Sequence, residues 1–149
     1  MVKTLGYMVT FTTYGTWMRG DSRGWRKNGK VFTANPRLKR IDESQMKGEI
    51  VRLGKNEKTI VRKAICKKAS SLGQKILAIS VWSNHVHVVV KYDGRKIEET
   101  VRIYKNAATA ALRRSGFRGR VWGSGYDKRF CFDEVALRKR IEYVEGHGI

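Results

Sequence analysis

The segment Ser83–Val90, with the sequence SNHVHVVV, constrains the fold more than any other part of the chain. Successive side chains of a β-strand point to opposite faces, so His85 and His87 share one face and the alternate valines share the other. The valine face predicts a surface that packs into a core. The two imidazoles, side by side on the opposite face, can bind one divalent cation. A His-x-His pair also occurs by chance on half-exposed strands, so this pattern by itself leaves its function open.

The net charge of the chain indicates what kind of partner it binds. The chain has 149 residues, enough for one domain with a core, and it carries 32 Lys and Arg against 13 Asp and Glu, a net charge of +19. Such a field favours a polyanion, first nucleic acid and second an anionic membrane surface. No apolar run is long enough to span a bilayer, and no segment pairs a basic helical face with a strongly apolar one, which disfavours a membrane partner.

Two further features concern the compartment. The N-terminus lacks the pattern of a signal peptide, and Cys66 and Cys131 fit no disulfide or metal framework. We therefore expect a cytoplasmic, nucleoid-associated protein with reduced cysteines and no small-molecule substrate.

Hydrophobic periodicity predicts the order strand, long insertion, helix, strand, strand, helix, strand, helix. The predicted strands cover 6–14, 75–82, 85–92 and 129–132, with further strand character at 121–122; the predicted helices cover 58–72, 95–115 and 134–146, and a short helix over 42–53 begins at Asp42. The nearly uninterrupted apolar run 75–82 predicts a central strand, joined to the histidine strand by a tight turn at 83–84. This order fits one α+β domain of the ferredoxin-like (RRM-like) class, with an antiparallel sheet, helices on the valine face and an open histidine face.

Two basic segments are candidates for contacts with DNA. The first is an insertion at about 15–57, rich in glycine and aromatic residues, with a short hairpin expected around Asn28-Gly29. Basic side chains bind phosphates and aromatic rings stack on unpaired bases. A solvated loop whose tryptophans pack into the core is the alternative reading. The residues that we expect to contact DNA in the two segments are Arg19, Arg23, Trp25, Arg26, Lys27, Arg118, Arg120, Lys128 and Arg129.

The last predicted helix carries a tyrosine and the third histidine. Tyr143 and His147 are four residues apart, so they lie on one helix face about one turn from each other. If this helix packs across the sheet edge, His147 can complete a metal site with His85 and His87, and Tyr143 can approach a phosphate held there. A tyrosine can then act as a covalent nucleophile. Spacing alone favours an ordinary packed helix residue at position 143.

Four segments together resemble the HUH single-tyrosine transposases of the insertion sequence 200/605 type, and most closely the REP-associated tyrosine transposases. The segments are Trp82–His87, Tyr143–His147, Thr12–Asp21 and Val121–Tyr126, and they occur in the same order as in that family. The His pair alone is weakly specific, whereas the four segments together are strongly specific.

The resemblance implies an enzyme of DNA transposition and recombination that acts on single-stranded DNA with Mg²⁺ or Mn²⁺ and recognises a hairpin. His85 and His87 match the metal ligands, and Tyr143 matches the nucleophile that forms a 5′-phosphotyrosine and frees a 3′-OH. The family usually has Gln where this chain has His147. Three histidines suit Mn²⁺ or Zn²⁺ better than Mg²⁺.

Three alternatives stay open. A replication-initiator or relaxase-like nickase would use the same chemistry without mobility. A non-catalytic, RRM-like binder of single-stranded nucleic acid would need neither the metal nor Tyr143. The tyrosine helix can also serve a partner's sheet, which would make a homodimer with exchanged helices.

Overall fold

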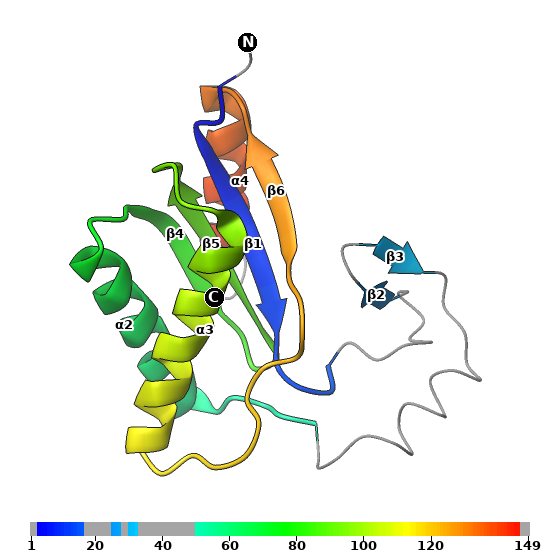
Figure 1. Cartoon of the computed structure of the whole chain (residues 1–149), viewed down its shortest axis with the longest axis vertical. Coiled ribbons are helices and arrows are strands. Elements are labelled where there is room, and N and C mark those ends of the chain that lie inside the picture. The colour runs from blue at the N-terminus through cyan, green and yellow to red at the C-terminus, as the bar shows by residue number, and fades with distance from the viewer. Residues whose placement is uncertain (1–2, 17–24, 28–29, 33–49, 147–149) are drawn as a thin grey trace.

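The computed structural model describes residues 3–16, 25–27, 30–32 and 50–146 (Figure 1). Its main feature is a four-stranded sheet formed by β1 (Gly6–Thr12), β4 (Ile76–Val81), β5 (His85–Lys91) and β6 (Asp127–Cys131). The strand order is β4-β5-β1-β6, and every neighbouring pair is antiparallel. Three helices complete this unit: α2 (Lys55–Ser71), α3 (Ile97–Arg114) and α4 (Glu134–Gly146). The α+β, ferredoxin-like prediction is confirmed.

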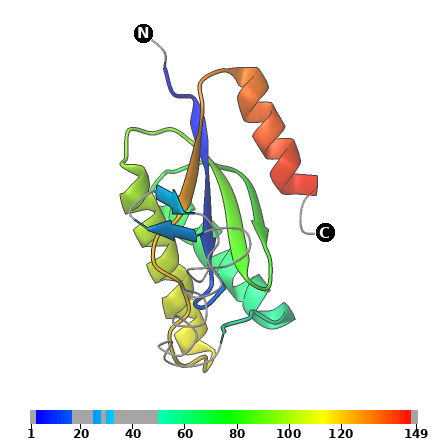
Figure 2. The same cartoon turned by 90° about the vertical axis from the view of Figure 1, so that its right-hand side faces the viewer.

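The predicted valine face is the core. Val86, Val88 and Val90 are fully buried against the helical layer of α2 and α3, together with Tyr7, Val9 and Phe11 of β1. Each such side chain contributes roughly 1.5–3 kcal/mol by leaving water. The predicted stripe of α3 faces the same core, with Tyr104, Ala108 and Leu112 completely buried. Figure 2 shows α3 and α4 on opposite sides of the sheet, and α2 packs against α3.

The prediction of a central strand at 75–82 is wrong. β4 lies at an edge of the sheet, and the central strands are β5 and β1. Its apolar sequence has another cause, because both of its faces are covered. Ile79 packs into the core under α2 and α3, and Ala78 packs with Val144 of α4 on the other face. Burial on both faces, which in most proteins marks a central strand, is here supplied by helices on either side of an edge strand.

Element ends follow capping chemistry. Helix α2 begins three residues earlier than predicted, because Glu57 accepts a hydrogen bond from the Gly54 backbone N–H at 2.9 Å. Asp133 caps α4 as predicted, accepting from the Ala136 N–H at 2.7 Å.

The insertion is described only in part. The expected hairpin is confirmed as the antiparallel pair β2 (Trp25–Lys27) and β3 (Lys30–Phe32). Of the helix predicted over 42–53, residues 42–49 lie outside the described part of the chain. Residues 50–53 are not helical, and the Leu53 N–H donates to the Ser83 oxygen at 2.7 Å.

Candidate active site

The turn before β5 presents the two histidines. The Trp82 N–H donates to the His85 oxygen at 2.8 Å, which confirms the predicted tight turn at Ser83-Asn84. Neighbouring segments hold this turn from two sides: the Leu53 N–H donates to Ser83 and the Thr13 N–H donates to the Asn84 oxygen at 3.0 Å. The histidine end of β5 is therefore tied to the C-terminal end of β1 and to the segment that precedes α2.

The imidazoles of His85 and His87 lie side by side, with ring centroids 4.8 Å apart and planes at 73°. His87 is only 7% exposed, whereas His85 is half-buried. The indole of Trp82 stacks on His85 with an 11° angle between the rings, at a centroid distance of 5.5 Å. These contacts restrict both rings, which lowers the entropy cost of binding a common ligand.

Each ring is oriented by a hydrogen bond at Nδ1. His85 Nδ1 lies 2.7 Å from the Asn84 side-chain oxygen, and His87 Nδ1 lies 2.7 Å from the Thr10 hydroxyl. Because an amide oxygen only accepts, the bond to Asn84 favours the tautomer of His85 that carries its proton on Nδ1. When the Thr10 hydroxyl accepts, His87 adopts the same tautomer. Metal-binding imidazoles in proteins have this arrangement, in which one nitrogen is held by a hydrogen bond and the other binds the metal.

Helix α4 covers part of the histidine face. Val144 is fully buried there against Met8, Ala78 and Val89. Gly6 of β1 permits this close packing, because a Cβ atom at that position would lie 2.9 Å from Leu137 Cδ1 of α4 and 2.8 Å from the Val90 oxygen. The histidine face is therefore open to solvent only where α4 does not cover it.

This packing brings Tyr143 to the histidines of its own chain. Its ring centroid is 5.6 Å from that of His87, at 69°, and the side chain is 47% exposed. The phenol thus borders both the histidine pair and solvent. His147, the third predicted ligand, lies outside the described residues. Within the described ranges, no group of three or more His, Cys, Asp or Glu side chains is placed to hold a metal ion, so the part described offers two imidazole ligands.

The predicted DNA-contacting residues fall in different places. Arg120 is exposed at the histidine end of the sheet: its guanidinium lies 4.4 Å from the ring centroid of Tyr14, and its Nε donates to the Trp122 oxygen. Arg118 is exposed and donates to the backbone oxygens of Arg113, in the last turn of α3, and of Phe117. Arg19 and Arg23 lie outside the described residues, and Trp25, Arg26 and Lys27 form β2, whose side chains are also outside them.

Two neighbouring basic residues of β6 point to opposite faces. Paired residues of antiparallel strands project to the same side. Arg129 pairs with Met8 and so projects to the histidine face, whereas Lys128 pairs with Val9 and projects to the other. Asp127 pairs with Thr10 and shares the histidine face, 3.4 Å from Arg129 Nε.

Three residues that position this region were not predicted. Thr10 and Asn84 orient the histidines, and Lys105 of α3 donates to the oxygens of Gly123 and Gly125. Burial, and secondarily Arg120, lowers the pKa of Lys105 from 10.5 to about 8. Alternation along β1 sets Thr10 opposite to the core residues Tyr7, Val9 and Phe11, a signal that could have found it. No sequence signal marked Lys105, because its partners are backbone oxygens of a distant loop.

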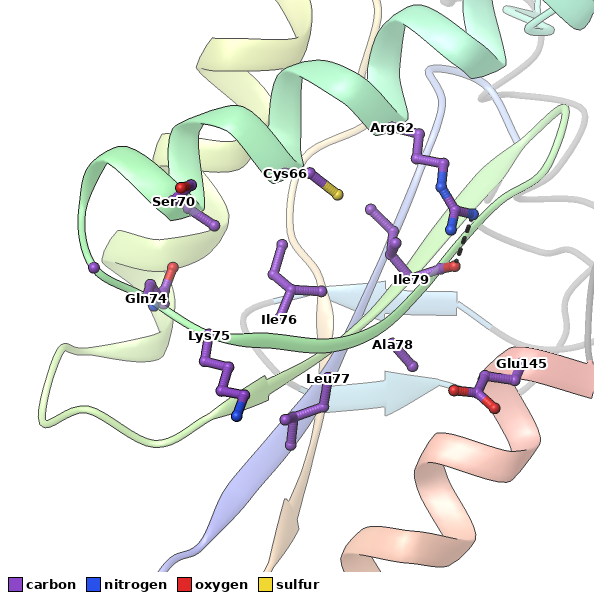
Figure 3. A pocket seen from close by; sticks show the side chains of 12 residues that line it. Arg62, Cys66, Ser70, Gln74, Lys75, Ile76, Leu77, Ala78, Ile79 and Glu145 are labelled. Atoms are coloured by element: carbon purple, nitrogen blue, oxygen red, sulfur yellow. Dashed lines mark hydrogen bonds between the residues drawn. The ribbon is translucent and has the colours of Figure 1, made fainter.

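A pocket at the β4 edge is separate from the histidine pair (Figure 3). It lies between the C-terminal half of α2 and Glu145 of α4, and Arg62 crosses it to donate to the Ile79 oxygen at 3.2 Å. Its lining contains neither His85 nor His87. The chemistry therefore points to the histidine face rather than to this hollow.

Comparison with known proteins gives matches at the levels of family and fold. The model of the family described as "Transposase IS200 like" matches residues 44–147. No curated protein matches the chain. The solved structure of a REP-associated tyrosine transposase bound to a REP hairpin is similar with a TM-score of 0.53 and 12% identity, over 96% of this chain and 66% of that one. A crystal structure of a protein from Deinococcus radiodurans R1 assigned as a transposase is similar with a TM-score of 0.54 and 14% identity, over 99% of this chain and 94% of that one.

Within the described residues, no helix is both long enough and apolar enough to cross a bilayer.

Proposed function

The chain belongs to the family of IS200-like transposases, which are enzymes that act on DNA, and from this membership we propose that it cleaves and rejoins single-stranded DNA through a covalent 5′-phosphotyrosine on Tyr143. The observation that carries the proposal is the contact between Tyr143 and His87 on the histidine face, at 5.6 Å between ring centroids. The tyrosine of the terminal helix and the His pair are 56 residues apart in the sequence. Packing of α4 brings them together.

The residues provide the parts of a phosphoryl transfer. The Tyr143 oxygen attacks phosphorus in line, the bond from phosphorus to the 3′ oxygen breaks, and the phosphate at the 5′ end of the downstream DNA fragment stays esterified to the tyrosine. The phenol loses its proton to solvent, to which it is exposed, and the leaving oxygen gains one to become the free 3′-OH. The later attack of a 3′-OH on the phosphotyrosine reverses these changes, so the bond is conserved for rejoining.

His85 and His87 are the proposed metal ligands through Nε2, with His147 as the third. The donor set fits, because both imidazoles have Nδ1 anchored and share one face. A bound divalent cation would neutralise charge on the phosphate and polarise phosphorus. Imidazole ligands favour Mn²⁺ over Mg²⁺, so Mn²⁺ is the first ion to test.

We propose that Tyr143 serves the histidines of its own chain, since the contact with His87 is made within one chain. Mixing His87→Ala with Tyr143→Phe tests this. Neither variant should cleave alone, and their mixture should also be inactive. Restored cleavage would show that the tyrosine acts on a partner's site in a homodimer with exchanged helices.

The proposed DNA substrate is a single strand that carries a hairpin. The exposed Arg118 and Arg120, the two basic residues of β6 and the insertion residues Arg19, Arg23, Trp25, Arg26 and Lys27 are the proposed contacts. The chain has 32 basic residues and 13 acidic residues, which supports contact with phosphates. Cytoplasmic, nucleoid-associated localisation follows from this partner.

Covalent capture tests the enzyme class. End-labelled single-stranded DNA that carries hairpins from the flanks of the gene is incubated with Mn²⁺ and resolved on a denaturing gel. The wild type should give an adduct that is lost in EDTA and in Tyr143→Phe. Tyr92→Phe is the matched control, because Tyr92 is 43% exposed and Tyr143 is 47% exposed. Adduct-free binding that EDTA does not affect would favour a non-catalytic binder, and cleavage without rejoining would favour a nickase.

A further inference from the structure

Two exposed aromatic side chains lie at the β6 edge of the sheet, opposite to β4: Phe130 is on β6 and Phe132 is the first residue after it. Phe130 is 45% exposed and Phe132 is 50% exposed, although their rings stack on each other with centroids 6.0 Å apart and planes at 20°. The Lys128 ammonium lies 5.7 Å from the Phe130 ring centroid. We call Lys128, Phe130 and Phe132 the β6 platform.

The β6 platform faces away from the histidines. Phe130 pairs with Tyr7, whose hydroxyl donates to Thr100 of α3 in the core, so Phe130 projects to the side of the sheet that carries α2 and α3. Phe132 follows the end of β6, and its ring stacks on that of Phe130, so it lies on the same side. Figure 1 shows α3 in front of the central strands, with β6 beside it and not beneath it. The rings therefore continue the core surface beyond the helical layer, where they meet solvent.

The surroundings of the rings favour an anionic partner over a second copy of this chain. Two chains of net charge +19 repel each other, and the cation of the platform lies directly against the apolar surface. An aromatic surface bordered by lysine offers stacking to bases and charge to phosphates in one place. Double-stranded DNA keeps its bases stacked inside the helix, so flat exposed rings suit unpaired bases.

We propose that the β6 platform binds unpaired bases of a single-stranded DNA segment by stacking, with Lys128 at the adjacent phosphate. This proposal rests on the proposed action on single-stranded DNA and adds a second place where the strand is held. Arg129, the next residue, projects to the histidine face, so the two basic side chains mark a path around the β6 edge. From β6 to the histidine strand β5 is two strand spacings, roughly 10 Å. One strand of DNA can therefore contact both faces.

Fluorescence anisotropy measures this binding in EDTA, where no cleavage interferes. The probes are a labelled oligothymidylate and an abasic oligonucleotide of the same length and charge. Phe130→Ala and Phe132→Ala should each weaken oligothymidylate binding roughly 5- to 150-fold, the range for loss of one stacked base. Neither should change binding of the abasic strand. Ile50→Ala, which truncates another exposed apolar side chain, should change neither.

Conservative variants separate stacking from folding. Phe132→Trp should retain or strengthen binding, whereas Phe132→Leu keeps apolar bulk but loses the aromatic face and should weaken it. Lys128→Ala should lower the salt dependence of binding to both strands. Equal losses for the oligothymidylate and abasic strands, or no loss in any variant, would overturn the proposal. So would sedimentation velocity showing a wild-type dimer that the Phe variants dissociate, since the platform would then be a protein interface.

The outcome is independent of the proposed chemistry. If the platform proposal fails, the wild type and the Phe variants still form the Tyr143 adduct with equal DNA dependence. If the catalytic proposal fails, no adduct forms, yet the difference between oligothymidylate and abasic strands persists.

Discussion

Replacing Thr10 with valine removes the hydroxyl that orients His87 while keeping nearly the same shape. The hydrogen bond between the Thr10 hydroxyl and His87 Nδ1 is 2.7 Å long, and His87 is 7% exposed, so water cannot readily replace the lost partner. An unsatisfied buried polar group costs about 1–3 kcal/mol of stability, which the added methyl group partly offsets. Without the bond, the ring loses both its orientation and its preference for the Nδ1–H tautomer. Loss of such a partner of a metal-binding histidine weakens metal affinity about 10- to 100-fold, or about 1.4–2.7 kcal/mol.

Isothermal titration with Mn²⁺ measures the affinity, and thermal unfolding monitored by circular dichroism measures the stability. Thr12→Val is the matched control, because Thr12 is on the same strand and face, beside His85, whose Nδ1 is bound to Asn84 instead. We expect Thr10→Val to weaken Mn²⁺ binding at least tenfold and Thr12→Val to leave it within about twofold. Equal Mn²⁺ affinities in the two variants and the wild type would refute the assignment of His87 as an oriented ligand.

Three further predictions concern the elements around this site. Val144→Ala should lower the free energy of unfolding by about 1.5–3 kcal/mol, because it leaves a cavity beneath α4. It should also slow adduct formation more than it weakens Mn²⁺ binding. An unchanged adduct rate would show that the packing of α4 does not position Tyr143. Burial lowers the pKa of Lys105 to about 8 in the folded chain. Between about pH 8 and 10.5 the unfolded chain therefore binds more protons than the folded chain, and the stability of the wild type should rise with pH. The difference in melting temperature between the wild type and Lys105→Met should change with pH in the same sense, and a constant difference would contradict this prediction. Arg120→Ala should reduce the slope of log affinity against log salt by about 1 for single-stranded DNA, whereas Arg62→Ala, at the β4 edge, should not; equal slopes in both would remove Arg120 from the phosphate contacts.

The sequence predicted the fold well for elements that have one face in the core and the other in water. Alternation gave the core face of β5, and apolar residues at three- and four-residue steps gave the buried face of α3. Those patterns arise because water lies on one side and the core on the other. For β4 the rule failed, because apolarity reports how many faces are covered and not how many strands are neighbours.

The candidate site was predictable only in part for a similar reason. The spacing of His85 and His87, and the helix that carries Tyr143, are local features that a sequence displays directly. The hydrogen bonds of the two histidines to Thr10 and Asn84, and those of Lys105 to the loop oxygens, depend on register between strands and on loop paths. The contact between Tyr143 and His87 required α4 to pack over Gly6 and Met8, which no local pattern specifies. The metal role of His147 stays a prediction, since that residue lies outside the described part.

Peptide mapping of the covalent adduct tests the central claim most directly. The wild-type protein is trapped on single-stranded DNA in Mn²⁺, digested with nuclease and trypsin, and the nucleotide-bearing peptide is sequenced by mass spectrometry. We expect the nucleotide to be attached through phosphate to Tyr143, in the peptide that follows Arg140. Attachment to Tyr126 or Tyr104 would contradict the assignment of Tyr143 as the nucleophile, because neither of these residues is part of the contact between α4 and the histidine pair.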